Sequence, residues 1–169
     1  MLVSFWMTQR LTREINTLEK QLIDKQIELS NHQKYAGVLG GSSILTLGNI
    51  AGLSPDLLPR ASLFAQYSDQ ASSMSAMQNI QMLKMTGRMP WLNNPMIQAQ
   101  YEMSAFQKFK EQAMKSLKEQ EASVLNEREK EIQLELNSIQ QQLKMKQAQL
   151  DSYKQHAASE ASKMAPDFG

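Results

Sequence analysis

Histidine is the first residue type to test for chemistry. The chain has two, His32 and His156, and no cysteine. A zinc site needs three or four nitrogen, sulfur or carboxylate ligands at set spacings, such as the H-E-x-x-H pair on a helix. Neither histidine belongs to such a motif, and the helix pairing that the heptads predict does not bring the two together. We therefore predict no metal site and no catalytic histidine.

Residues 40–43, GGSS, are the only stretch that resembles a phosphate-binding loop. Such a loop also supplies a lysine and follows a strand, and neither is present here. Acidic and basic residues alternate along residues 127–131, a pattern typical of a solvated helix face. No concave site that would tune a carboxylate for acid or base work is indicated. We predict that the protein is not an enzyme and binds no cofactor.

The balance of charge argues against nucleic acid as a partner. The chain has 18 basic and 17 acidic residues, and this net charge of +1 gives no field to attract a polyanion. The most basic patch lies at residues 108–118, where Glu111 dilutes its lysines. We predict no nucleic-acid partner.

The elements that must position any functional residue are helices. With 169 residues, 7% of them aromatic, and long polar runs, the chain fits helices paired along narrow seams. We predict an all-α fold, an elongated antiparallel helical hairpin or coiled coil. Its long C-terminal helix, flanked by two shorter ones, has neither proline nor glycine over about 68 residues. The expected segments of this single domain, 1–169, are a first helix at 8–36, an uncharged Gly/Pro-rich connection at 37–60, a second helix at 61–86, a proline corner at 87–95, the long helix at 96–163 and a frayed tail at 164–169.

The two outer helices carry heptads that predict how they pair. Leucine and isoleucine recur at a and d along the first helix, and Gly37 is expected to end it. Lys25 and Glu129 interrupt the two seams, and an opposite pair in one layer can set the register of an antiparallel coiled coil. We therefore predict that Lys25 faces Glu129. Pairing within one chain is favoured because the segments are tethered, although pairing between chains stays open.

The second helix shows a different pattern. Phe64, Tyr67, Ala71, Met74 and Met77 follow one another at intervals of three or four, which predicts a contact face of small residues and methionines. Methionine adapts its shape, so this face suits either a loosely specified core or a binding surface.

Residues 35–55 raise the question of a membrane. The stretch has two Gly-x-x-x-Gly spacings, but five glycines and several hydroxyls leave too little hydrophobicity to span a bilayer. The N-terminal residues 1–10 also lack a basic region and a cleavage site. We expect no transmembrane helix and no Sec signal peptide, so the protein is either cytoplasmic or exported by a signal-independent route.

The distribution of charge points to association. Between residues 35 and 83 only Asp56, Arg60 and Asp69 are charged, and an assembling subunit would bury such a region against neighbours. The predicted interaction surface is the set of large apolar residues in this region and at two tryptophans: Phe5, Trp6, Val38, Leu39, Ile44, Leu45, Leu47, Ile50, Leu53, Met74, Met77 and Trp91.

These observations favour a non-enzymatic structural protein that self-assembles through its uncharged, Gly/Ser/Met-rich end. In layout it is similar to helical subunits exported without a signal peptide, which implies a bacterial filament, appendage or secretion-associated component. The alternative is a cytoplasmic coiled-coil adaptor or export chaperone, whose hairpin shape it resembles, bound to another helical protein. A membrane-active helical hairpin is the third hypothesis.

Overall fold

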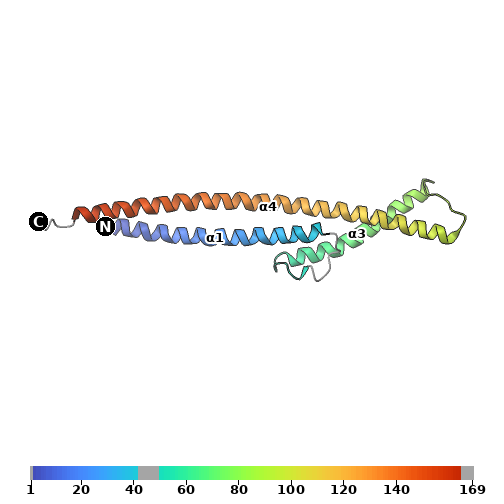
Figure 1. Cartoon of the computed structure of the whole chain (residues 1–169), viewed down its shortest axis with the longest axis horizontal. Helices are drawn as coiled ribbons and strands as arrows, with labels where there is room; N and C mark the ends of the chain where they lie inside the picture. Colours follow the sequence, from blue (N-terminus) through green and yellow to red (C-terminus); the bar gives the residue numbers. More distant parts are fainter. Residues whose placement is uncertain (1, 42–49, 165–169) are drawn as a thin grey trace. The chain divides into compact units, whose positions relative to one another are not determined.

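The structure is a computed structural model and describes residues 2–41 and 50–164. It consists of the helices α1 (Leu2–Gly40), α3 (Leu58–Met85) and α4 (Pro95–Met164), with no strand among the described residues (Figure 1). The predicted all-α fold, with a long C-terminal helix flanked by two shorter ones, is confirmed. Residue 1 and the segments 42–49 and 165–169 lie outside the described residues, and Met164, the first residue of the predicted tail, is the last residue of α4.

The first helix is longer than predicted and continues through Gly37 to Gly40. Glycine within a helix costs about 1 kcal/mol relative to alanine, which is why it was expected to end the helix. Tyr35 and Leu39, one turn apart on either side of Gly37, are both buried in the core. Their packing outweighs the local propensity.

The turn between α3 and α4 has a C-terminal cap that ends α3, followed by an N-cap that begins α4. Gly87 has a φ of +65°, and the amide of Arg88 donates to the carbonyl of Leu83 at 3.1 Å, the pattern of a Schellman cap. Asn94 caps the next helix by accepting from the amide of Met96 at 3.0 Å. Pro95 then occupies the first helical position, where its missing amide costs nothing.

The contacts group the chain into two compact units. Unit 1 comprises Met1–Ser30 and Arg128–Gly169, and unit 2 comprises Asn31–Glu127.

In unit 1, the N-terminal part of α1 pairs with the C-terminal part of α4. Ion pairs join Glu14 to Lys146 at 2.7 Å and Lys25 to Glu135 at 2.6 Å. Residue numbers therefore fall along α4 as they rise along α1, and the two helices are antiparallel (Figure 1). The seam is formed by buried leucine and isoleucine at heptad positions of both helices, namely Leu11, Ile15, Ile132 and Leu136.

The predicted partner of Lys25 is wrong. Its ammonium lies 2.6 Å from Glu135 and 2.8 Å from Glu28, instead of pairing with Glu129. Side chains lean toward the N-terminus of their own helix. In an antiparallel pair a lysine on α1 therefore reaches a carboxylate further along α4 than the residue level with it.

In unit 2, the core forms where the end of α1 meets the start of α3 and the middle of α4. Its members are apolar side chains exposed by 7% or less: Tyr35, Leu39, Ile50, Leu53, Leu57, Ala61 and Leu125. Four apolar residues of the connection, Leu39, Ile50, Leu53 and Leu57, thus belong to the chain's own core. This corrects the expectation that Leu39, Ile50 and Leu53 form an interaction surface.

The predicted contact face of α3 is buried only in part, since Phe64 packs against the core of unit 2. The buried residues of the helix are small ones, Ala61, Ser68, Ser72 and Ala76, whereas Tyr67, Met74 and Met77 are exposed. Small side chains let two helix backbones approach closely. The buried hydroxyls of Ser68 and Ser72 bond to carbonyls of their own helix. Ion pairs from Asp69 to Lys110 and from Lys84 to Glu102, each 2.8 Å, show that α3 and α4 run antiparallel.

Candidate association surface

A polar cluster in unit 2 links all three helices through one carboxylate. Arg60, near the start of α3, bonds both oxygens of Glu121 on α4, at 2.6 and 3.1 Å. Tyr35 of α1 donates its hydroxyl to the same carboxylate at 3.1 Å. The bond from Arg60 lowers the pKa of Glu121, despite partial burial. Burial and the adjacent negative charge raise the pKa of Tyr35, so its hydroxyl stays protonated at neutral pH.

This cluster stabilises the fold and was missed by the sequence analysis. The available signal was Arg60, a cation isolated within an uncharged stretch that therefore needs a partner. The identity of Glu121 as that partner depends on how α3 folds back on α4. The carboxylate of Glu121 accepts hydrogen bonds from both Arg60 and Tyr35.

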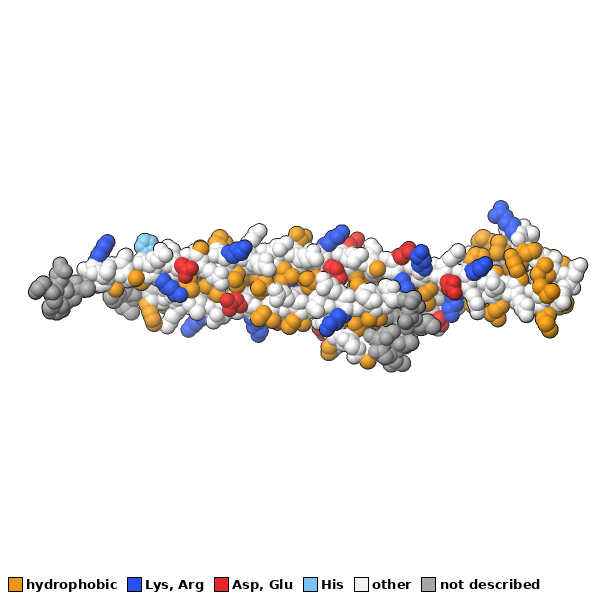
Figure 2. Space-filling view, viewed as in Figure 1, with side chains coloured by type: hydrophobic (Ala, Val, Ile, Leu, Met, Phe, Trp, Pro, Cys, Tyr) orange, Lys and Arg blue, Asp and Glu red, His pale blue; other side chains and the backbone are white. Residues whose placement is uncertain are grey.

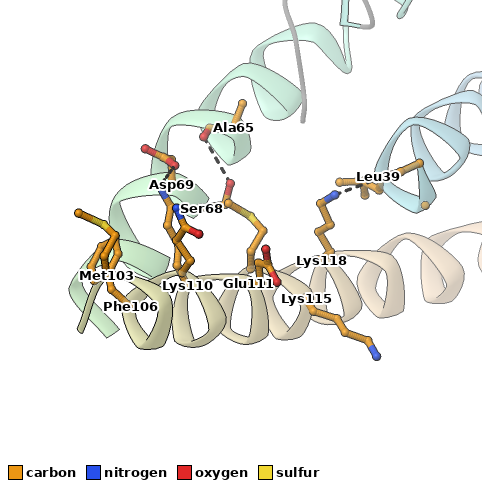
Figure 3. A pocket seen from close by; sticks show the side chains of 14 residues that line it. Leu39, Ala65, Ser68, Asp69, Met103, Phe106, Lys110, Glu111, Lys115 and Lys118 are labelled. Atoms are coloured by element: carbon orange, nitrogen blue, oxygen red, sulfur yellow. Dashed lines mark hydrogen bonds and ion pairs between the residues drawn. The ribbon is translucent and has the colours of Figure 1, made fainter. Parts of the chain in front are cut away.

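A groove of about 850 Å³ lies beside this core, between the end of α1, α3 and α4 (Figure 3). Phe106, Met103 and Met114 contribute its apolar lining. Lys110 points toward Asp69, and Lys118 points toward the end of α1, where it donates to the carbonyl of Gly41 at 3.3 Å (Figure 3). These two cations are engaged within the chain, so the groove has no clear charge preference for a ligand.

The outward side of α3 carries the most regular apolar surface of unit 2. Tyr67, Met74 and Met77 are 70%, 62% and 58% exposed, and they lie on the side of the helix opposite the buried Ser72. Residues 70–83 of this helix include no charged side chain. Exposed apolar patches on proteins include sites of protein association.

A second apolar patch surrounds the turn from α3 to α4. Hydrophobic side chains gather there in Figure 2, and they include Trp91, which is 87% exposed, as well as Met85 and Met96. Proline and the helix caps fix the backbone of this turn, while its large side chains project outward.

The structure separates the predicted interaction surface into four groups. Met74, Met77 and Trp91 are exposed in unit 2. Phe5 and Trp6 are exposed in unit 1, where the guanidinium of Arg10 lies 5.8 Å from the Trp6 ring. Val38 is half-buried against the core, and the other described members are buried. Ile44, Leu45 and Leu47 lie outside the described residues.

Among residues 2–41 and 50–164, no group of three or more His, Asp or Glu side chains is placed to hold a metal ion. Within the same part of the chain, no helix has the length and apolar character needed to cross a membrane.

Comparison with known proteins leaves the association surface to be interpreted on physical grounds. No protein-family model, no curated protein and no solved structure matches this chain.

Proposed function

We propose that this chain is a non-enzymatic structural protein that self-assembles through unit 2. The observation that carries the proposal is the outward side of α3, where Tyr67, Met74 and Met77 are exposed on a face without charge. A monomer gains no stability from such a surface, whereas burying it between subunits removes apolar area from water. The class of assembly that the layout fits is a filament, an appendage or a secretion-associated component of bacteria.

The surface is consistent with association rather than with a disrupted core. The helix already buries a complete seam, Ala61 to Ala76, on its inner side, and the exposed residues form a separate stripe. Methionine is suited to such a stripe because its flexible, polarisable side chain adapts to a partner.

Sedimentation velocity and light scattering over a hundredfold range of protein concentration test the proposal, with negative-stain microscopy to show the shape of any assembly. We expect a mass that is a multiple of the monomer and that rises with concentration. A monomer at every concentration would contradict self-assembly.

A second candidate function is an adaptor that binds another helical protein through unit 1. Ile23 and Ile27, one turn apart on α1, are exposed by 55% and 54%. Together they form a short apolar strip that a partner helix could cover. Replacing both with glutamate separates the two functions, because it would abolish binding by an adaptor while self-assembly through α3 would persist.

A further inference from the structure

The exposed side of α3 has a repeating pattern that identifies its occupant. Its outermost positions follow one another at alternating intervals of four and three, and all are exposed: Leu63, Tyr67, Gln70, Met74, Met77, Gln81 and Lys84. We call this set the outer stripe of α3. An alternation of four and three is the spacing of a coiled-coil seam, so the outer stripe is a seam that the chain leaves exposed, although Lys84 at its end pairs with Glu102.

The outer stripe is complementary to itself. From Tyr67 to Lys84 its intervals read the same in both directions about a point midway between Met74 and Met77, and Leu63 lies beyond this symmetric part. Two antiparallel copies of α3 related by a two-fold axis at this point would place Met74 against Met77 of the second copy, twice. Gln70 would meet Gln81 in the next layer outward, and Tyr67 would meet Lys84 beyond that. This is an isologous interface, in which the same patch serves both subunits.

The charges of α3 favour this antiparallel arrangement. Asp69 lies toward one end of the outer stripe and Lys84 lies at the other, and residues 70–83 between them are uncharged. Within the chain, Asp69 pairs with Lys110 and Lys84 pairs with Glu102. The side chains of Asp69 and Lys84 nevertheless remain substantially exposed. Antiparallel copies bring the acidic end of one helix to the basic end of the other. A parallel pair would instead set like charges side by side.

The chemistry of each layer is also consistent with a second copy. Paired methionines at the centre fill an apolar layer with adaptable side chains. Glutamine amides carry both donors and acceptors and can therefore bond to each other across the axis. At each end the ring of Tyr67 offers a face to the Lys84 ammonium, a cation–π arrangement. We propose that a second copy of this chain docks on the outer stripe of α3 as an antiparallel two-fold pair. This inference rests on the proposed self-assembly and specifies its interface.

Cysteine pairing tests the geometry directly, because the chain has no cysteine of its own. Gln70→Cys/Gln81→Cys in the full-length protein should form a covalent dimer under mild oxidation. Each single variant, Gln70→Cys or Gln81→Cys, should stay a monomer on a non-reducing gel. The reason is that like positions in the antiparallel pair lie about 16 Å apart along the axis, at 1.5 Å per residue, beyond the reach of a disulfide. Cross-linking of the single variants would indicate a parallel pair and would overturn the proposal.

Charge variants at the centre provide a second measurement. Met74→Glu/Met77→Glu places four carboxylates around the axis, and we expect the mass in solution to fall to that of the monomer. Met74→Glu/Met77→Lys sets opposite charges against each other only in the antiparallel pair and should restore the dimer. Leu134→Glu is the matched control, because Leu134 is 69% exposed in unit 1 and its replacement should leave the mass unchanged. Circular dichroism checks that every variant keeps its helix content.

The outcomes distinguish the interface from the proposed function. An oligomeric wild-type protein whose double-cysteine variant does not cross-link would overturn the interface and leave self-assembly through another surface, such as the turn at Trp91. A wild-type protein that is monomeric at every concentration would overturn both, and the outer stripe would then belong to a different occupant.

Discussion

Tyr35 and Glu121 are 86 positions apart in the sequence, yet the tyrosine hydroxyl donates a hydrogen bond of 3.1 Å to the carboxylate. Arg60 of α3 donates hydrogen bonds to both oxygens of the same carboxylate, at 2.6 and 3.1 Å. Glu121 is therefore the point at which the three helices of unit 2 are tied together by polar contacts. Its side chain is 14% exposed, which shields these bonds from water.

Removing the charge of Glu121 tests how much this tie contributes to stability. We expect Glu121→Gln to lower the free energy of unfolding by about 1–3 kcal/mol, because the guanidinium of Arg60 loses a charged acceptor. Urea unfolding followed by circular dichroism measures the change. Glu119→Gln is the control, since Glu119 is well exposed and lies 3.9 Å from Lys115, so its loss should cost less than about 0.5 kcal/mol. Equal losses in the two variants would contradict the role of the cluster.

The same carboxylate predicts how stability depends on pH. The bond from Arg60 holds the pKa of Glu121 in the folded protein below the usual 4.5. A lowered folded pKa means that the stabilisation is complete above the unfolded pKa and is lost as pH falls through the folded value. The difference in stability between wild type and Glu121→Gln should therefore be full at pH 7 and shrink below pH 4.5. A difference that stays constant down to pH 2.5 would show that Glu121 does not titrate in this way.

The partner of Lys25 can be identified by a charge-reversal cycle in unit 1. Lys25→Glu places a carboxylate beside Glu28 and Glu135 and should lower the thermal midpoint. Adding Glu135→Lys should recover part of the loss, with a coupling of about 0.3–1 kcal/mol for a partly exposed pair. Glu129→Lys in the same background should recover less. Stronger recovery with Glu129→Lys would instead identify Glu129 as the partner of Lys25.

Two glycines should respond to alanine with opposite signs. Gly87 has a φ of +65°, a conformation that costs a side chain about 1 kcal/mol or more, so Gly87→Ala should destabilise. Gly37 lies in the interior of α1 with open space where a Cβ would lie, so Gly37→Ala should stabilise by up to about 1 kcal/mol. Thermal melts of the two variants give both signs. Destabilisation by Gly37→Ala would mean that α1 does not continue through this residue.

The inner seam of α3 should tolerate no increase in size. Ala76 is fully buried, so Ala76→Leu should force α3 away from α4 and cost about 1–3 kcal/mol. Met77→Leu, at the exposed neighbouring position, is the matched control and should change the unfolding free energy by less than about 0.5 kcal/mol. The comparison is made by urea unfolding at low protein concentration, where association does not contribute. If both variants were equally stable, the seam of small residues would not face α4.

The sequence by itself determined the helices and most of the seam between the outer two. The heptad spacing of Leu11, Ile15, Ile132 and Leu136 reflects a period set by backbone geometry, and these residues are buried as that period requires. The proline and glycine signals around residues 87–95 likewise act locally, through fixed φ angles and missing donors. Such features depend on near neighbours and are readable without a tertiary structure.

Only the tertiary structure decided which face of a helix turns inward and which charges meet. On α3 the spacing of Tyr67, Met74 and Met77 left both a core face and a binding surface open. Close approach to α4 buried the small residues instead, a choice that depends on the distance between two backbones. The uncharged connection likewise proved to be part of a core, because Leu39 and Leu53 are covered by residues distant in sequence. Pairs such as Tyr35 with Glu121 arise in the same way. Their energy comes from contacts between residues far apart in the sequence, and the local spacing of residues does not predict those contacts.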